Sequence, residues 1–378
     1  MNNNMNIAIL TLYHGNTNYG ALLQAYALQK ALSDLEVGAK QISYELSSGY
    51  PSRKRRFSAN QLIPRVSNKI KRILWNRKRK KRDIIIQQFA DEIPHTELVT
   101  ADTIAQLNEQ FDLFVCGSDQ IWNPIGWQPT LFLDFVTTGN KKVSYAASMA
   151  RNDLSESEKA YATRYLTDFY AISVREERSA EILNDILLDK KVKIVPDPVF
   201  LLPAQEWEKM ATPNQTTQPF VFVYLLGDNI SHREQAKRFA LENHLVMQYI
   251  PYLNFKAFEW DNRNTTLFAE NQSVESFLEL IYDAKVVITD SFHAAAFSMI
   301  FGTRVFVLKR FREGDPNSMN SRLESLMKTF YLTDNLAEVL PQTLQEIKPQ
   351  AKTAMNILQK MRASGVGYLR SNCISNNK

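Results

Sequence analysis

The sequence predicts an α/β fold made of two doubly wound domains. Asn6–Tyr13 has the pattern of a buried strand, and a polar turn and apolar residues at helical spacing follow it through Leu32. The composition turns to Gln, Thr, Asn and Pro over Pro203–Pro219, and a second series of strands and helices begins at Phe220. A chain of 378 residues is long enough for two cores. We therefore expect an N-terminal domain of residues 1–205, a C-terminal domain of residues 206–345, and a helix with a tail over residues 346–378.

Short apolar segments continue the N-terminal domain. The strands predicted after the first are Ile42–Tyr44, Phe111–Cys116, the segments beginning at Lys142 and Ala171, and Val192–Val195. Polar residues follow most of these strands, among them Arg175, after which a helix begins near Glu176. Because ligands bind at the carboxyl ends of the strands in open α/β sheets, these polar residues predict a ligand site at that edge.

The C-terminal series shows the same alternation and ends in a distinctive corner. Its expected elements are strand Phe220–Leu226, a helix over residues 233–242, strand Leu245–Ile250 and helix Phe277–Ala284 with Ser273 as N-cap. Strand Val286–Thr289 then leads into Asp290-Ser291-Phe292-His293, a helix of small residues, Gly302 and another strand. A helix that starts there exposes backbone N–H groups to an anion. The tail is expected to be mostly helical over Leu344–Tyr368 and disordered over Ser371–Lys378.

The amino-acid composition and the spacing of the cysteines exclude several classes of protein. An apolar content of 44% and a charged content of 22% are typical of a soluble globular protein. There is no apolar run long enough to span a membrane, and the first apolar segment is a strand rather than a secretory signal. Cys116 and Cys373 lie far apart without metal spacing. We therefore expect a cytoplasmic protein with no disulfide and no structural zinc.

A basic segment interrupts the N-terminal domain over about residues 50–90. Arg53–Arg82 contains fourteen Lys or Arg and no acidic residue, so removing it from the net charge of +5 leaves the rest near −9. Apolar residues at helical spacing favour a basic amphipathic hairpin. It is either a solvated insertion or a binding site for an anionic membrane surface or a diphosphate-bearing lipid carrier. No recognisable nucleic-acid-binding fold accompanies it, so nucleic acid is not expected as a partner.

His293 is the strongest candidate for proton transfer. The five histidines have no metal-ligand spacing, and neither a GxGxxG, a P-loop nor a GxSxG motif is present. His293 differs from the others because it follows a strand end beside Asp290 and Ser291, and His14 holds the corresponding place in the first half. Arginines with hydroxyl and amide side chains suit a phosphate-bearing donor and a polyhydroxylated acceptor.

Over most of residues 6–330 the sequence resembles the polysaccharide pyruvyl transferase family. The segments that carry the resemblance are Asn18-Tyr19-Gly20-Ala21 with Gln24, Gly117–Asn123, Ser144–Ser148, Ser173–Glu176, Asp197-Pro198, Thr289–Ala294 with Phe297-Ser298, and Asn320–Arg322. The resemblance implies two Rossmann-like domains that face each other across a cleft, as in the GT-B fold. It also implies phosphoenolpyruvate as the donor substrate, a pyruvate ketal on a sugar as the product, and neither a further cofactor nor a metal.

The resemblance also implies roles for residues. His293 matches the family's acid or base, and Arg175 matches an arginine that holds the donor phosphate. Some relatives have a second arginine where this chain has Ser291, and Arg322, Arg310 and Lys309 are the candidates to replace it. The expected donor-side residues are Asp290, Ser291, Phe292, Lys309, Arg310, Asn320 and Arg322. The expected acceptor-side residues are His14, Asn18, Tyr19, Gly20, Gln24, Ser118, Asp119, Gln120, Trp122, Asn123, Tyr145 and Ser148.

We expect an enzyme of capsular or exopolysaccharide biosynthesis that acts on a sugar linked to polyprenyl diphosphate at the cytoplasmic face of the membrane. Two alternatives remain open at this point. One is a nucleotide-sugar glycosyltransferase of the same architecture, and the other is a carbohydrate- or membrane-binding protein without catalysis. The clustering of polar residues at strand ends favours an enzyme.

Overall fold

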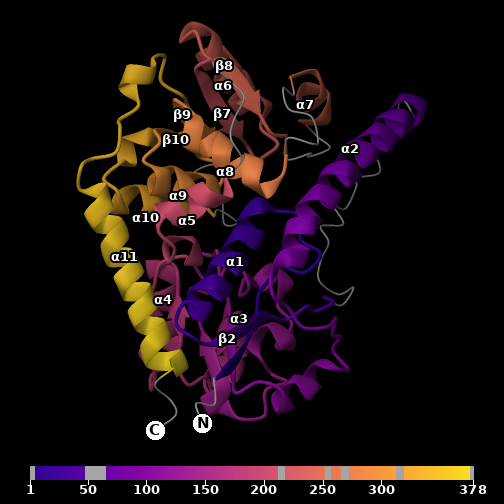
Figure 1. Ribbon diagram of the computed structural model, residues 1–378, viewed down its shortest axis with the longest axis vertical. Coiled ribbons are helices and arrows are strands. Elements are labelled where there is room, and N and C mark those ends of the chain that lie inside the picture. The colour runs from indigo at the N-terminus through magenta and orange to yellow at the C-terminus, as the bar shows by residue number, and fades with distance from the viewer. Residues whose placement is uncertain are drawn as a thin grey trace.

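The computed structural model describes residues 5–46, 65–211, 218–251, 257–264, 272–311 and 319–374. The first part of the basic segment, residues 312–318 and the last four residues are among those that lie outside these ranges. Two parallel sheets organise the chain, one on either side of the predicted boundary near residue 205. Figure 1 shows their two lobes one above the other, with α11 running along both.

The N-terminal sheet has four parallel strands in the order β2-β1-β3-β4. Their bounds are β1 Asn6–Leu10, β2 Gly38–Gln41, β3 Leu113–Cys116 and β4 Lys142–Ser144. The short parallel strands β5 (Ser173–Val174) and β6 (Lys193–Ile194) continue beside β4 through isolated bridges. The helices of this half are α1 Tyr19–Ser33, α2 Arg65–Glu92, α3 Glu156–Leu166 and α4 Glu177–Ile186. α5 (Ala204–Met210) lies at the boundary, with Trp207 against Phe297 of the C-terminal half.

The second strand lies earlier than the sequence predicts. We expected Ile42–Tyr44, whereas β2 covers Gly38–Gln41 and pairs with β1 from Asn6 onward. The apolar residues that suggested a strand belong to the segment just after β2, where Tyr44 makes one bridge to Val99. Register with β1, rather than local apolar content, therefore decides where the strand begins.

The C-terminal sheet has five parallel strands in the order β11-β10-β9-β7-β8. Their bounds are β7 Phe220–Tyr224, β8 Val246–Tyr249, β9 Val286–Thr289, β10 Val305–Leu308 and β11 Leu336–Ala337. The helices are α6 Ile230–Glu242, α7 Phe258–Asn264, α8 Val274–Asp283, α9 Phe292–Phe301 and α10 Ser321–Thr329. The predicted cap is confirmed, because the Ser273 hydroxyl accepts a hydrogen bond from the Ser276 N–H at 3.1 Å.

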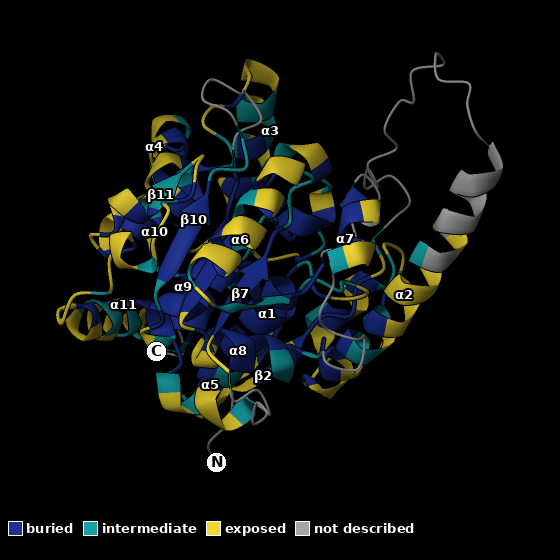
Figure 2. Cartoon of the chain, turned by 90° about the horizontal axis from the view of Figure 1, so that it is seen from above, coloured by how far each residue is buried: buried dark blue, intermediate teal, exposed yellow. Residues whose placement is uncertain are grey.

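The two halves share a buried layer formed largely by α1, α8 and α9. The Tyr19 ring of α1 stacks on Phe277 of α8 with ring centroids 4.4 Å apart, and its hydroxyl donates to the Gln272 carbonyl at 2.6 Å. One apolar cluster includes residues of both halves, such as Leu22 and Ala295. In Figure 2, α1, α8 and α9 are mostly dark blue at the centre of the molecule. The start of α1 is therefore held against the C-terminal half.

The end of the chain returns to the N-terminal half. The tail was expected to be helical over Leu344–Tyr368, and the helix that forms, α11, covers Ala354–Leu369. A Cβ added to Gly365 of α11 would lie 2.5 Å from the Tyr145 hydroxyl, so the helix approaches β4 closely. The predicted disorder from Ser371 is wrong for the described part, because residues 370–374 form a π-helical turn with Cys373 fully buried.

The basic segment forms a helix in its second part. Only one arm of the predicted hairpin is described, as the single helix α2, which extends away from the body in Figure 1. Its C-terminal end is anchored, since Ile86, Phe89 and Ala90 belong to the core. None of the described helices is both long enough and apolar enough to cross a membrane.

Candidate active site

The corner between β9 and α9 places His293 as the sequence predicts. Thr289 ends β9, and its hydroxyl accepts a hydrogen bond from the Ser291 N–H at 3.0 Å. Ser291 is the N-cap of α9, with its hydroxyl 3.5 Å from the Ala294 N–H. Gly302 ends the helix with a φ of 75°, a left-handed value that favours glycine. His293 is therefore fixed in the first turn of α9, where it is buried.

A buried carboxylate joins His293 to Arg175. Oδ2 of Asp197 lies 2.5 Å from Nη1 of Arg175 and 3.5 Å from Nε2 of His293, while Oδ1 accepts from the Val199 N–H at 3.1 Å. Burial acts to raise the pKa of Asp197, but His293 and Arg175 outweigh it and hold that pKa well below its usual range. The sequence indicated Asp197 only as part of a motif before Pro198. Its position after a predicted strand end was the signal that could have identified it.

Arg175 lies among three carboxylates and one aromatic ring. Its Nε is 3.0 Å from Oε1 of Glu176, and its Nη2 is 3.7 Å from Oδ1 of Asp119. Its guanidinium carbon lies 4.4 Å from the centre of the Phe292 ring, a cation–π contact. Burial acts to lower the pKa of Arg175, but Glu176, Asp197 and Asp119 together raise it. The guanidinium is thus a permanent charge in a fixed orientation.

Arg322 is the second buried arginine of the cluster. It is 8% exposed, and no carboxylate among the described residues lies within ion-pair distance of it. With the Gln120 amide oriented so that its oxygen faces Arg322, both Nη atoms lie 3.0 Å from that oxygen. Burial first, and then the nearby charge of Arg175, lower the pKa of Arg322 to about 10. Arg322 stays charged at neutral pH, and the described carboxylates nearest to it, Asp119 and Glu176, offset its charge only without a direct ion pair.

Three buried nitrogens of this cluster have no hydrogen-bond partner among the described residues. They are Nη2 of Arg175, Nε of Arg322 and Nε2 of His293. Buried polar groups in proteins are nearly always paired, and an unpaired one costs about 1–3 kcal/mol. Two of them still lie within ion-pair distance of a carboxylate, Nη2 of Arg175 near Asp119 and Nε2 of His293 near Asp197. Arginine with imidazole suits an anion, so the cluster is the candidate anion site.

A cavity of about 350 Å³ lies beside Arg175 and Arg322, whereas His293 is not among the residues that line it. Arg175, Asp197, Phe292 and Arg322 line one part of it, and residues of α10 and α11 line the rest. The structure thus brings together residues from four separate parts of the chain next to an open space.

Other expected donor-side residues have partners in the fold. The Asp290 carboxylate accepts from the N–H groups of Leu226 and Gly227 at 2.6 and 2.8 Å, and Arg310 lies 3.2 Å from it. Lys309 is 3.7 Å from Glu324. The Asn320 amide donates to the Phe311 carbonyl at 2.7 Å. These residues hold the loops around the cluster in place.

The expected acceptor-side residues fall into three groups. Gly20 lies against His293, with Asn18 beside it as the N-cap of α1, while His14 is exposed in the preceding turn. Asp119 and Gln120 reach Arg175 and Arg322. The remaining residues are buried or nearly so and pack in the N-terminal half: Tyr19, Gln24, Ser118, Trp122, Asn123, Tyr145 and Ser148.

Two of these buried residues, Gln24 and Trp122, follow strands as expected but have no contact with solvent. The Gln24 amide donates to the Thr11 hydroxyl at 3.0 Å and accepts from the Ser118 N–H at 3.3 Å. The Trp122 indole donates to the Leu131 carbonyl at 3.2 Å and stacks on Phe132. Both side chains are fully buried, so in this conformation they support the loop after β3 rather than face a ligand.

The described residues include no group of three or more His, Cys, Asp or Glu side chains that could hold a metal ion. Both cysteines are buried and unpaired with each other.

The model of the family described as polysaccharide pyruvyl transferase matches residues 18–310, more than three quarters of the chain. The chain belongs to this family. The matched region contains Gly20, Arg175, Asp197 and His293, whereas Arg322 and α11 lie beyond its end. Comparison with curated protein sequences gives no match.

Solved structures share the fold of this pyruvyl transferase family member. One is described as a UDP-N-acetylglucosamine 2-epimerase from Listeria monocytogenes, with a TM-score of 0.53 at 9% identity over 99% of this chain and 98% of that chain. Another is UGT89C1 of Arabidopsis thaliana in complex with UDP-L-rhamnose, with a TM-score of 0.50 at 7% identity over 99% of this chain and 100% of that chain. At such identities the likeness shows the fold alone, and it is the expected GT-B arrangement.

Proposed function

We propose that the protein transfers the enolpyruvyl group of phosphoenolpyruvate to a sugar diol and forms a pyruvate ketal. Family membership supports a pyruvyl transferase. The observation that carries the choice of donor is the set of nitrogens without a hydrogen bond on Arg175, Arg322 and His293, which gather around the buried Asp197. Phosphoenolpyruvate offers a phosphate and a carboxylate to such donors, together with a methylene carbon that accepts a proton.

Arg322 takes the place of the arginine that relatives have at the position of Ser291. Arg310 is held by Asp290, and Lys309 is partly exposed and near Glu324. Arg175 is close to Glu176 and Asp197, which largely neutralise it. Arg322 therefore supplies the positive charge that attracts the donor phosphate, while Arg175 orients the donor through its fixed fork.

His293 acts as the acid of the first step. The imidazolium gives its proton to the methylene carbon, the double-bond electrons form the new C–H bond, and an oxocarbenium-like centre develops at the neighbouring carbon. A sugar hydroxyl attacks that carbon. The C–O bond to phosphate then breaks, and the electron pair leaves with the phosphate.

A second sugar hydroxyl closes the ketal ring. Of the two hydroxyl protons released, one returns to His293 and the other leaves with phosphate, so the acid is regenerated. Asp197 is a positioning residue in this scheme, because it stabilises the imidazolium and orients the ring.

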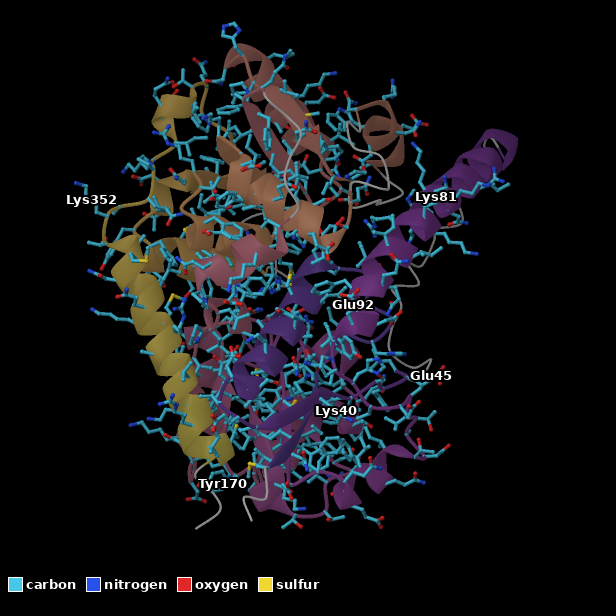
Figure 3. The ribbon with its side chains drawn as sticks, in the orientation of Figure 1. Lys40, Glu45, Lys81, Glu92, Tyr170 and Lys352 are labelled. Atoms are coloured by element: carbon cyan, nitrogen blue, oxygen red, sulfur yellow. The ribbon has the colours of Figure 1, made fainter. Side chains whose placement is uncertain are left out.

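The acceptor is proposed to be a lipid-linked sugar at the inner face of the membrane, within capsular or exopolysaccharide synthesis. The basic helix α2 supports this part. Arg77, Lys80 and Lys81 are exposed on it, and Ile73 is 52% exposed beside them. Figure 3 shows Lys81 on the part of α2 that leaves the body. Basic and apolar residues together suit an anionic membrane surface.

Thermal denaturation with two donors tests the proposed reaction. A ligand that binds only the folded chain raises its melting temperature. Phosphoenolpyruvate at 1 mM should raise the melting temperature by roughly 2–5 °C, and UDP-N-acetylglucosamine should not. The opposite result would replace the proposal by a nucleotide-sugar glycosyltransferase.

Three variants then test the assignments. Arg322→Gln should abolish the shift with phosphoenolpyruvate, and Lys309→Gln, its matched control, should keep it. His293→Ala should retain part of the shift with phosphoenolpyruvate, because Arg175 and Arg322 remain, but slow phosphate release in the presence of acceptor roughly 100-fold or more. Full activity of His293→Ala would remove the histidine from the mechanism.

A further inference from the structure

Two cavities adjoin along one side of α11. The first is the cavity of about 350 Å³ beside Arg175 and Arg322. The second has a volume of about 590 Å³ and lies between α11 and the edge of β6. Ile194, Val195 and Ser364 line both, so the two cavities border each other. We call the pair the α11 groove.

One face of α11 forms a wall of the groove. Lys360, Ser364, Gly367 and Ser371 are spaced by four, three and four residues, so they lie on one side of the helix. All four are exposed. Gly365 packs against Tyr145 and Leu201 on another side, so the rotation of the helix is fixed. A Cβ added to Gly367 meets no atom within 4 Å, which leaves the centre of this wall open.

The opposite wall is basic and carries an exposed aromatic ring. In the second cavity, Lys190, Lys191 and Lys193 line it with a single carboxylate, that of Asp189, whereas the first cavity sets Arg175, Arg322 and Lys360 against Glu176, Glu177 and Asp197. Lys190 donates to the Phe169 carbonyl, whereas Lys191 and Lys193 are exposed and form no ion pair with any described residue. Tyr170 is 47% exposed and lies beyond the lower end of α11 in Figure 3.

This set of groups identifies a class of ligand. An exposed tyrosine ring offers a flat apolar surface to the face of a sugar, serine hydroxyls pair with its hydroxyl groups, and lysines favour negative charge. The volume of the groove exceeds what a single small anion needs. The chemistry is that of an oligosaccharide carrying carboxylate or phosphate groups.

We propose that the α11 groove binds the acceptor as an anionic oligosaccharide and leads it to the Arg175–Arg322 cluster. The role as acceptor site rests on the proposed function, because the groove ends at the proposed donor cluster. Most of its helical wall lies beyond residue 310, where the family match ends. The groove therefore determines which glycan this member of the family accepts, separately from the shared chemistry.

Binding measured without donor tests the groove. Calorimetric titration of the full chain with tri-galacturonate, a carboxylated trisaccharide, should show saturable binding at least about 10-fold tighter than maltotriose, which has no charge. Gly367→Phe should weaken that binding at least 10-fold, because the ring fills open space. Gly367→Ala, the matched control, should bind as the wild type does. A Lys191→Gln/Lys193→Gln variant should bind tri-galacturonate about 10-fold more weakly, and its affinity should depend less on salt concentration.

Three results would overturn the proposal. They are equal binding of maltotriose, unchanged binding to Gly367→Phe, and complete displacement of tri-galacturonate by 1 mM inorganic phosphate. The melting-temperature shift with phosphoenolpyruvate is measured on the same Gly367→Phe variant and should persist. If phosphoenolpyruvate does not bind while tri-galacturonate binds in the groove, the proposed donor is wrong and the glycan site stands. If only phosphoenolpyruvate binds, the groove proposal fails by itself.

Discussion

Gly20, at the start of α1, lies directly against the imidazole of His293, at the start of α9. A Cβ built on Gly20 would fall well inside van der Waals contact with Nδ1 and Cγ of that ring. The two residues belong to different halves of the chain and are 273 positions apart. The acid proposed for catalysis belongs to the C-terminal half and is held against the N-terminal half, by Gly20 near Nδ1 and Asp197 near Nε2.

Gly20→Ala should displace the His293 ring and lower kcat roughly 10- to 100-fold. The added methyl group cannot be accommodated unless α1 or the imidazole moves. The measurement is the initial rate of phosphate release together with the melting temperature. Gly367→Ala is the matched control, since it adds the same group to a helix in open space. An unchanged kcat for Gly20→Ala would mean that the ring position is not needed.

Asp197→Asn should destabilise the fold by about 3–5 kcal/mol at pH 7, because it leaves the buried Arg175 without its closest partner. The folded pKa of Asp197 is depressed, so its contribution is present above its unfolded pKa, about 3.9, and is lost as pH falls through the folded value. Urea unfolding should thus show a difference in the free energy of unfolding between the wild type and Asp197→Asn that is largest at pH 7 and smaller at pH 3. A difference that grows toward low pH would contradict the depressed pKa of Asp197.

Glu279→Gln should stabilise the protein at alkaline pH. Glu279 of α8 is 6% exposed, and burial first and Asp283 second raise its pKa to about 7. A carboxyl with a raised folded pKa destabilises the fold fully above that value and not at all below its unfolded pKa, about 4.3. After allowance for solvent, we expect a rise in melting temperature of roughly 2 °C at pH 8.5. At pH 4 the variant and the wild type should melt together.

Neutralising the exposed basic residues of α2 should weaken membrane binding. The variant Arg77→Gln/Lys80→Gln/Lys81→Gln removes charges that have no ion pair with any described residue. Each charge contributes about 1 kcal/mol to binding near an anionic surface. The affinity for phosphatidylglycerol vesicles in low salt, measured by sedimentation, should therefore fall roughly 100-fold. Deleting the whole segment through Arg82 would be a poorer test, because Arg82 is buried and donates to the Pro251 carbonyl.

The matched control for α2 removes three lysines from other surfaces. Lys40, Lys328 and Lys352 are exposed, and two of them are labelled in Figure 3 far from Lys81. Their triple Gln variant changes the net charge equally and should bind vesicles nearly as the wild type does. Equal loss in both variants would show that net charge, and not α2, determines the binding.

Local signals located most of the elements that carry the site. Strand Val286–Thr289 has the predicted bounds, Ser291 caps the helix after it, and Gly302 ends that helix. Each of these depends on residues within a few positions of one another. The strand predicted at Ile42–Tyr44 was wrong because its register depends on β1, some thirty residues away.

The composition of the site could not be read in the same way. Asp197 looked like the end of a domain, yet it joins Arg175 to His293. Gln24 and Trp122 looked like contacts for an acceptor, yet both are fully buried. Whether a polar residue at a strand end faces a ligand or the interior depends on what packs against it.

Periodicity, caps and motifs along the chain were enough for the α/β class, the order of its strands and helices, and the likeness to a family. Only the folded chain shows that Arg175, Asp197, His293 and Arg322 meet, that Gly20 borders the imidazole, and that α11 returns to form a groove. The physical reason is the distance along the chain over which each kind of interaction acts. Backbone hydrogen bonds and side-chain spacing act over a few residues, whereas these contacts depend on how two sheets and their helices pack against each other.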